Sequence, residues 1–354
     1  MNRPLIRCDI FCVVVDNLGD AGVCWRLARQ LATEHSWQVR LIIDRPEVLP
    51  PLVPDLPAQP VQVCPWGEAD TAAAAGRWQP GEVVIEAFAC ALPESVLAAM
   101  AARPRPPVWL NLEYLSAEAW IDDCHGLASP HPTLPLIKHF YFPGFSAASG
   151  GLLHEADYAA RRTAFDPRAW WQQMGLPPRR PGEKALSLFS YPHAPRDALF
   201  AALSTLGRPL SVLLPGDAGP ARTIGAVRLL PLPFRSQRDY DELLWAADLN
   251  LVRGEDSFVR AQLAGRPMLW HIYPQAEDAH LTKLDAFLAR YPGTPPWQAL
   301  TRWWNGAAAT PPEGALAPLL DGALDRAATD WSAALLARPG LAVELASFCR
   351  ARLE

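Results

Sequence analysis

The stretch Asp9-Ile-Phe-Cys-Val-Val-Val15 is a continuous apolar run, rich in β-branched residues, that stops at a polar turn. Such a run is typical of a strand buried on both faces of a parallel sheet. From residue 22 to residue 34, apolar side chains recur at helical spacing, with arginine and glutamine on the other side. Residues 37–43 form a second strand-like run. This part of the chain therefore predicts a strand–helix–strand unit.

The same alternation continues along the chain in two series. The further predicted strands are 82–86 and 108–112 in the first series, and 185–189, 210–214, 248–252 and 267–272 in the second. Between the series, residues 143–182 are rich in glycine, alanine, proline and arginine, which favours a connector. We predict two doubly wound, Rossmann-like α/β domains, over residues 1–155 and 178–335. Their ligands should lie at the carboxyl ends of the strands and between the domains.

The composition limits the classes of function. Half of the 354 residues are apolar and 19% are charged, the balance of a soluble globular protein. With 32 basic and 37 acidic residues and no Lys/Arg-rich run, no direct nucleic-acid partner is expected. No apolar run reaches the roughly 20 residues of a membrane span. The seven cysteines include no Cys-x-x-Cys pair and no secretory leader is evident, so we expect a reduced, cytoplasmic protein.

The turn after the first strand carries two carboxylates. It reads Asp16-Asn-Leu-Gly-Asp20-Ala-Gly22 and matches neither Gly-x-Gly-x-x-Gly nor the P-loop Gly-x-x-x-x-Gly-Lys-Ser/Thr. Asp16 or Asp20 could cap the following helix, because aspartate is a favoured N-cap residue. A cap needs only one carboxylate, whereas two at the end of a parallel strand are well placed to handle a proton or a cation. We favour a functional role, with helix capping as the alternative.

A second polar turn follows the third strand of the second series. The sequence Arg253-Gly-Glu-Asp-Ser257 precedes a helix that ends at Gly265, an arrangement that fits glycosyltransferases with two α/β domains. The helix start offers unpaired N–H groups and a positive dipole end to a pyrophosphate. Arg253 could add bidentate phosphate contacts. A surface ion pair of Arg253 with Glu255 or Asp256 is the alternative.

Other polar and aromatic side chains lie at two more strand ends. Phe189 and Tyr191 close the first strand of the second series, where they could be core residues or could stack on a nucleobase and reach a phosphate. Asn111, Glu113 and Tyr114 end a strand of the first series, and there an acceptor-pocket wall and an ordinary loop are equally consistent with the sequence. The eight histidines show no His-x-x-x-His or His-Glu-x-x-His spacing, so we expect no metal site.

Several strings taken together resemble one family. They are residues 9–31, Asn111-Leu-Glu-Tyr-Leu-Ser-Ala-Glu118, His139-Phe-Tyr-Phe-Pro-Gly-Phe145, Leu188-Phe-Ser-Tyr191, Arg253-Gly-Glu-Asp-Ser-Phe-Val-Arg-Ala-Gln262 and Trp270-His-Ile-Tyr-Pro-Gln275. They are similar to the EarP family of protein-arginine rhamnosyltransferases, which modify bacterial elongation factor P. The similarity covers nearly the whole chain.

The resemblance implies a GT-B glycosyltransferase fold of two facing Rossmann-like domains, with the C-terminal helix, residues 340–354, packed on the first. It also implies transfer of L-rhamnose from dTDP-β-L-rhamnose to an arginine of elongation factor P, with inversion, no metal ion and no cofactor. The modified factor is then active in relieving ribosomes stalled at proline runs. The candidate residues are Asp20 and Asp16 for catalysis, Phe189, Tyr191, Arg253, Glu255, Asp256, Ser257 and Gln262 for the donor, and Asn17, Gly19, Asn111, Glu113 and Tyr114 on the acceptor side.

Arginine as the acceptor would explain why two carboxylates, Asp16 and Asp20, are needed. An arginine guanidinium is protonated at neutral pH and its lone pairs are delocalised, so it is a poor nucleophile. Asp16 would grip and polarise it, while Asp20 accepts a proton as nitrogen attacks the sugar. Alternatives are another GT-B nucleotide-sugar transferase and a non-catalytic module that binds elongation factor P. A Rossmann oxidoreductase would need the glycine fingerprint that is absent here.

Overall fold

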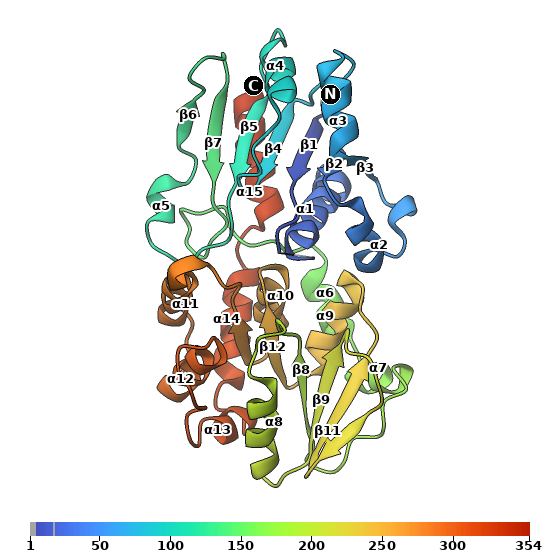
Figure 1. Cartoon of the computed structure of the whole chain (residues 1–354), viewed down its shortest axis with the longest axis vertical. Helices are drawn as coiled ribbons and strands as arrows, with labels where there is room; N and C mark the ends of the chain where they lie inside the picture. The colour runs from blue at the N-terminus through green and yellow to red at the C-terminus, as the bar shows by residue number, and fades with distance from the viewer. Residues whose placement is uncertain (1–4, 17) are drawn as a thin grey trace. The chain divides into compact units, whose positions relative to one another are not determined.

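The computed structural model describes residues 5–16 and 18–354, and its internal contacts divide the chain into two compact units. Unit 1 comprises Met1–Ala156 and Arg338–Glu354, and unit 2 comprises Asp157–Ala337. Both are α/β units built on one sheet each (Figure 1).

Residues 157–177 are not the connector that the sequence predicted. They form the helices α6 (Tyr158–Ala164) and α7 (Pro167–Gln173) of unit 2. Trp170 and Trp171 are buried in a hydrophobic cluster of that unit, and the hydroxyl of Tyr158 accepts a 2.8 Å hydrogen bond from Trp245 Nε1. Proline and glycine predicted a connector, whereas large aromatic side chains attach the segment to the core.

Unit 1 contains a seven-stranded sheet of order β3-β2-β1-β4-β5-β7-β6, parallel except for β6. The strands are β1 (Arg7–Cys12), β2 (Gln38–Ile43), β3 (Val61–Pro65), β4 (Val83–Ala87), β5 (Val108–Leu112), β6 (Ala128–Pro130) and β7 (Ile137–Tyr141). The helices are α1 (Gly19–His35), α2 (Leu49–Leu52), α3 (Trp66–Ala74), α4 (Glu94–Ala101), α5 (Ile121–Cys124) and α15 (Leu341–Leu353), with short 3₁₀ turns η1 (Pro46–Val48) and η2 (Leu56–Ala58).

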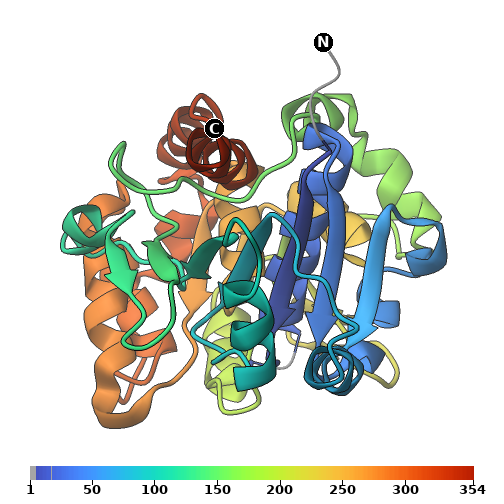
Figure 2. The ribbon, with the colours of Figure 1, turned by 90° about the horizontal axis from the view of Figure 1, so that it is seen from above.

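Alternate residues of β1 face two different hydrophobic layers. Ile10 and Cys12 pack in a cluster with residues of α1 and with Leu345 of α15. Phe11 packs in a second cluster with Met100 of α4. The period of two in a strand separates these side chains, and helices on both sides bury them (Figure 2). This double coverage explains why the strand reads as one unbroken apolar run.

The stretch Asp325–Leu353 has the length and apolar composition of a membrane-crossing helix. It consists of two helices, α14 (Asp325–Leu336) and α15, separated at residues 337–340. α14 belongs to unit 2 and α15 to unit 1. Buried helices of a protein core pass the same test of composition, so the stretch is weak evidence for a membrane span.

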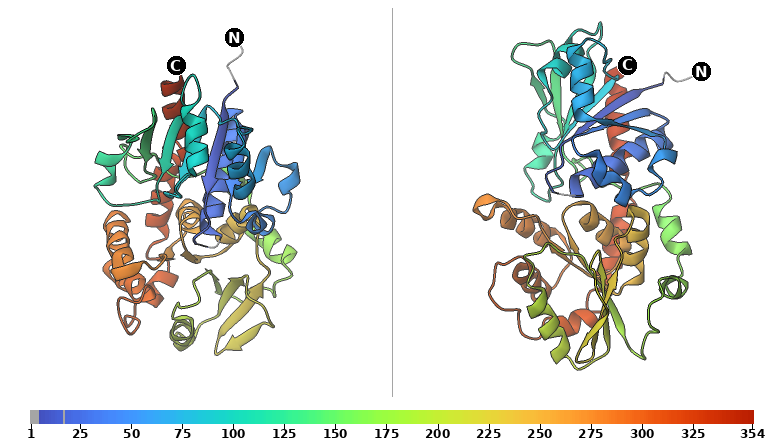
Figure 3. Two further views of the ribbon diagram at one scale, coloured as in Figure 1. Left: turned by 45° about the horizontal axis from the view of Figure 1, so that its top comes forward. Right: turned by 45° about the vertical axis from the view of Figure 1, so that its right-hand side comes forward.

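Unit 2 is built on a sheet of its own (Figure 3). The six strands have the order β10-β11-β9-β8-β12-β13, and only β10 pairs in the antiparallel sense. The strands are β8 (Lys184–Leu188), β9 (Leu210–Pro215), β10 (Arg222–Ile224), β11 (Val227–Leu232), β12 (Leu249–Arg253) and β13 (Met268–His271). The remaining helices are α8 (Arg196–Thr205), α9 (Gln237–Ala246), α10 (Asp256–Ala264), η3 (Ala276–Asp278), α11 (Ala279–Arg290), α12 (Pro295–Trp304) and α13 (Leu316–Leu320).

Each sheet has a topological switch point beside its first strand. In unit 1 the chain moves outward from β1 to β2 and β3, then returns to β4 on the other side of β1. In unit 2 it moves outward from β8 through β9 to β10 and β11, then returns to β12 on the other side of β8. Ligands of doubly wound sheets bind outside the carboxyl ends of the strands at such points. The turns after β1, β8 and β12 therefore occupy the expected positions of a site.

Candidate functional site

The turn after β1 brings a buried carboxylate to the switch point of unit 1. Helix α1 begins at Gly19, three residues earlier than predicted, so Asp20 lies in its first turn. Asp20 is 2% exposed, and its Oδ2 accepts 2.8 Å hydrogen bonds from the backbone N–H groups of Val15 and Asp16. No residue that the structure describes donates to its Oδ1. One carboxylate oxygen is thus fixed, and the other is available to an incoming donor.

Neither Asp16 nor Asp20 is the N-cap residue of α1. That residue is Leu18, whose side chain makes no capping hydrogen bond. Asp16 lies against Gly19, because a Cβ at position 19 would be 2.8 Å from Asp16 Oδ2. Glycine at this position therefore makes room for the second carboxylate. Asn17, predicted on the acceptor side, lies outside the described residues.

The loop after β4, the strand next to β1, has an unusual backbone. Phe88, Ala89 and Ala91 have φ angles of 58°, 53° and 53°, in the left-handed region that costs a residue other than glycine roughly 1–2 kcal/mol. Side chains hold this conformation: Asn111 Oδ1 accepts from Ala89 N–H at 3.1 Å, and Glu86 Oε1 accepts from Ala91 N–H at 3.2 Å. Backbone of this kind is found most often at functional sites.

The predicted residues at the end of β5 are joined to the same loop. Asn111 is 1% exposed, and its Nδ2 donates to Glu113 Oε1. The ring of Tyr114 stacks on Phe88, with centroids 4.3 Å apart and planes at 12°. Asn111 therefore holds the backbone of the loop after β4 through its bond to Ala89 N–H. Phe88 and Glu86 were not predicted as site residues, and the available signal was their place at the end of the strand predicted over residues 82–86.

Three predicted donor-side residues meet at the switch point of unit 2. The register pairs Leu251 of β12 with Leu188 of β8, so the residues that follow these two lie side by side. The Arg253 guanidinium carbon lies 4.3 Å from the ring centroid of Phe189 and 4.7 Å from that of Tyr191. These are cation–π distances. The two rings orient the guanidinium plane.

The first turn of α10 presents further polar groups. The Ser257 hydroxyl donates to the Arg253 carbonyl, which connects the turn to the strand. Asp256 Oδ2 accepts from Gln237 Nε2 at 3.3 Å. Gln237, the first residue of α9, is a site residue that no sequence motif marked.

A buried imidazole supports Tyr191. The Tyr191 backbone N–H donates to Nδ1 of His271 at 3.3 Å, and His271 is 2% exposed. Burial, with smaller effects from the charges of His193 and Arg253, lowers the pKa of His271 to about 3. His271 is therefore neutral at pH 7, as an Nδ1 acceptor must be.

The low pKa of His271 predicts acid sensitivity of unit 2. The unfolded chain binds this proton below about pH 6.5, whereas the folded chain binds it only below about pH 3, so stability falls as the pH drops between these values. At pH 5 the loss is about 2 kcal/mol relative to pH 7. Urea unfolding of the wild type and of His271→Asn, which keeps an acceptor but does not titrate, measures it. Equal losses in both proteins would contradict this assignment.

A family model described as the Elongation-Factor P (EF-P) rhamnosyltransferase EarP matches residues 8–350. The chain belongs to the EarP family. A protein-arginine rhamnosyltransferase of Pseudomonas putida is 48% identical over 307 residues, 80% of this chain and 81% of that protein. A solved structure, described as the structural basis for EarP-mediated arginine glycosylation of translation elongation factor EF-P, is 32% identical to this chain. Its TM-score is 0.64, and the match covers 98% of this chain and 99% of that chain. The spinosyn forosaminyltransferase SpnP, at 14% identity and a TM-score of 0.58, is similar in fold alone. The match covers 99% of this chain and 100% of that chain. The predicted resemblance and the GT-B α/β fold are confirmed.

One residue of the EarP-like strings lies elsewhere in the fold. Gln262 is 2% exposed, and its Nε2 donates to the Phe258 carbonyl at 3.3 Å. Its Oε1 accepts from Trp331 Nε1 of α14 at 2.9 Å. Both the nitrogen and the oxygen of the Gln262 amide therefore make hydrogen bonds inside unit 2, and the bond to Trp331 connects α10 to α14. The donor role of Gln262 therefore stays a prediction, because similarity along a helix does not distinguish the faces of that helix.

Within residues 5–16 and 18–354, no group of three or more His, Cys, Asp or Glu side chains could hold a metal ion. An Asp-x-Asp spacing does occur at Asp239 and Asp241. Asp241, however, is fully buried and bonds to Arg260 at 2.6 and 2.7 Å. The spacing in this EarP family member therefore serves the core.

Proposed function

We propose that this chain transfers L-rhamnose from dTDP-β-L-rhamnose to an arginine side chain of elongation factor P, with inversion and without a divalent metal ion. Membership of the EarP family supports the class of enzyme and the acceptor. The observation that carries the proposal is the geometry of Asp20. Its carboxylate is buried at a switch point, with one oxygen held by two N–H groups and the other without a donor in the described chain.

The acceptor step needs a base and a group that localises charge. A guanidinium N–H donates to Asp20 Oδ1, and Asp16 binds the opposite side of the guanidinium. The terminal nitrogen attacks the anomeric carbon, its proton passes to Asp20, and the bond from that carbon to the diphosphate oxygen breaks. Attack opposite the leaving diphosphate inverts the configuration. The stacked rings of Phe88 and Tyr114 lie at the same sheet edge and supply an apolar wall for the acceptor.

The leaving diphosphate needs positive charge, which Arg253 and the start of α10 provide. Backbone N–H groups at a helix start bind phosphate, and a preorganised cation stabilises the charge that develops on the leaving oxygen. Glu255 and Asp256 would repel phosphate, so we assign them to hydroxyl groups of the donor. The ring of Phe189 covers one side of this subsite, beside the base and sugar.

Replacing Arg253 tests the donor subsite. Arg253→Ala removes a charge-assisted phosphate contact worth about 1.5–3 kcal/mol, so the affinity for dTDP-rhamnose should fall roughly ten- to hundredfold in calorimetry. Arg179→Ala is the matched control, because Arg179 also lies over a ring, that of Trp171, but precedes β8 at the opposite sheet edge. An unchanged affinity of Arg253→Ala would remove Arg253 from the subsite.

The proposed reaction itself is tested by mass spectrometry of elongation factor P after incubation with the enzyme and dTDP-rhamnose. We expect a gain of one deoxyhexose on an arginine, at the same rate with EDTA present. A panel of other nucleotide sugars tests the alternative of a different transferase. A factor that binds but gains no mass with any donor would favour a non-catalytic binding module.

A further inference from the structure

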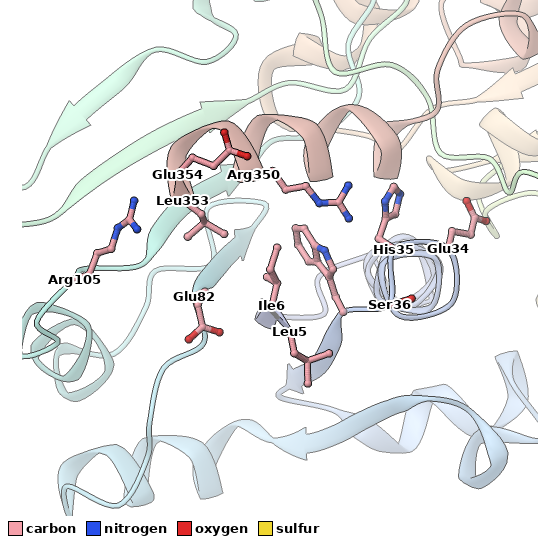
Figure 4. A pocket seen from close by; sticks show the side chains of 11 residues that line it. Leu5, Ile6, Glu34, His35, Ser36, Glu82, Arg105, Arg350, Leu353 and Glu354 are labelled. Atoms are coloured by element: carbon pink, nitrogen blue, oxygen red, sulfur yellow. The ribbon is translucent and has the colours of Figure 1, made fainter. Parts of the chain in front are cut away.

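A cavity of about 750 Å³ lies in unit 1 at the sheet edge opposite the Asp20 turn (Figure 4). Leu5 and Ile6 precede β1, and Glu82 precedes β4, so these residues line the cavity where the parallel strands begin. Asp20 follows the other end of β1. The end of α1 and the last turn of α15 form the remaining walls. The cavity is therefore separate from the turn proposed for sugar transfer.

Two buried ring nitrogens of residues that line this cavity have no hydrogen-bond partner in the described chain. Trp37 is 4% exposed and lines the cavity, yet no described residue accepts from its indole Nε1. The Nε2 atom of His35 is also buried without a partner in the described chain. Buried donors in folded proteins are nearly always paired with protein, water or ligand. This corner of the cavity is thus a polar site that lacks an acceptor.

The same corner carries a positive charge. The guanidinium of Arg350 makes no ion pair or hydrogen bond with the residues that the structure describes, and Figure 4 shows it turned toward His35. Burial and then the charge of Arg350 lower the pKa of His35, and no carboxylate opposes them. An anion placed here would meet the charge of Arg350 and the indole N–H of Trp37, and the Nε2–H tautomer of His35 would also donate to it.

The acidic residues of the cavity are engaged or point to solvent. Glu82 pairs with Arg7 and Arg103, at 3.0 Å each. Burial acts in the opposite direction, but these bonds lower the pKa of Glu82 to about 2. Glu34 accepts a backbone N–H at 3.2 Å, and Glu354 is exposed. The uncompensated charge in the cavity is therefore the positive charge of arginine.

We propose that this cavity binds a small organic carboxylate with an apolar body. The carboxylate oxygens would accept from Trp37 Nε1, His35 Nε2 and the Arg350 guanidinium. The apolar body would lie against Leu5 and Ile6, which face the cavity from the start of β1. A volume of this size suits a small ligand. The proposal does not rest on the transferase activity.

The probe is 3-phenylpropionate, a carboxylate on an apolar phenyl body, with 3-phenylpropanol as the uncharged match. In ¹⁵N NMR spectra of the full chain, the indole N–H signal of Trp37 is the one absent from Trp37→Phe. We expect 3-phenylpropionate to shift that signal downfield in a saturable way, because a carboxylate then accepts from it. The alcohol should bind at least about tenfold more weakly.

Two arginines of α15 provide matched variants. Arg350→Gln should weaken the binding of 3-phenylpropionate at least about tenfold. Arg352→Gln should not, because Arg352 is absent from the cavity lining. Asp20→Asn should bind the probe like the wild type, since Asp20 lies at the other sheet edge. No saturable shift at millimolar probe, equal effects of the two arginine variants, or equal binding of acid and alcohol would each overturn the proposal, leaving a water-filled or merely apolar cavity.

Discussion

Asp20→Asn should lower the single-turnover rate of arginine modification by about 10²- to 10⁴-fold, the usual range for a general base. In the wild type, Oδ2 accepts hydrogen bonds from the N–H groups of Val15 and Asp16, and the amide oxygen of asparagine can still accept both. Its NH₂ group then replaces Oδ1, where it neither takes a proton nor attracts a guanidinium. Fold and donor binding should therefore persist while transfer is lost. Asp16→Asn should lose less, because an amide oxygen still orients one guanidinium N–H.

A second carboxylate that accepts a backbone N–H near the end of β1 gives the control. Asp44 Oδ1 accepts from Val14 N–H at 3.0 Å, in the same region at the end of β1. Asp44→Asn keeps that bond and should keep the rate. Melting temperatures of Asp20→Asn and Asp44→Asn should both stay near that of the wild type. If Asp20→Asn were as active as Asp44→Asn, the role of Asp20 would be limited to holding the loop, and another residue would have to act as the base.

Asp241→Ala should destabilise unit 2 by about 3–5 kcal/mol, the usual cost of leaving a buried charge without its partner. Asp241 and Arg260 are both fully buried, and their two hydrogen bonds measure 2.6 and 2.7 Å. The Arg260 guanidinium also lies 4.3 Å from the ring centroid of Tyr158 in α6. Removing the carboxylate leaves this cation in the core between α6, α9 and α10. Urea unfolding followed by tryptophan fluorescence measures the loss.

An exposed ion pair of the same unit is the comparison. Asp330, whose side chain is 71% exposed, pairs with Arg326 at 3.6 Å. Surface pairs of this kind contribute about 0–1 kcal/mol, so Asp330→Ala should unfold at nearly the wild-type urea concentration. Comparable losses for Asp241→Ala and Asp330→Ala would show that the Arg260 pair is relaxed or hydrated in solution.

Local patterns predicted eight of the strands in the described chain and missed β3, β6, β7, β10 and β11. The strand–helix alternation, the polar turns after the strands and the helix that ends at Gly265 were all predicted from the sequence. Gly265 has a φ of 69° and forms the left-handed C-cap of α10. These features depend on residues close together in the chain, so periodicity and turn chemistry suffice to find them. The aromatic residues of α6 and α7 were missed because connector composition outweighed them.

Tertiary structure alone decided which side chains meet. Arg253 lies between Phe189 and Tyr191 because the register of β12 against β8 places their strand ends together, and that register depends on the whole sheet. Helix geometry and the α10–α14 contact likewise turn Gln262 toward Trp331. Residue patterns within the chain predicted two Rossmann-like units and the polar turns that follow their strands. Whether each polar side chain of a turn serves a ligand or the core was fixed only by packing between segments far apart in the chain, where each buried polar group must find a partner.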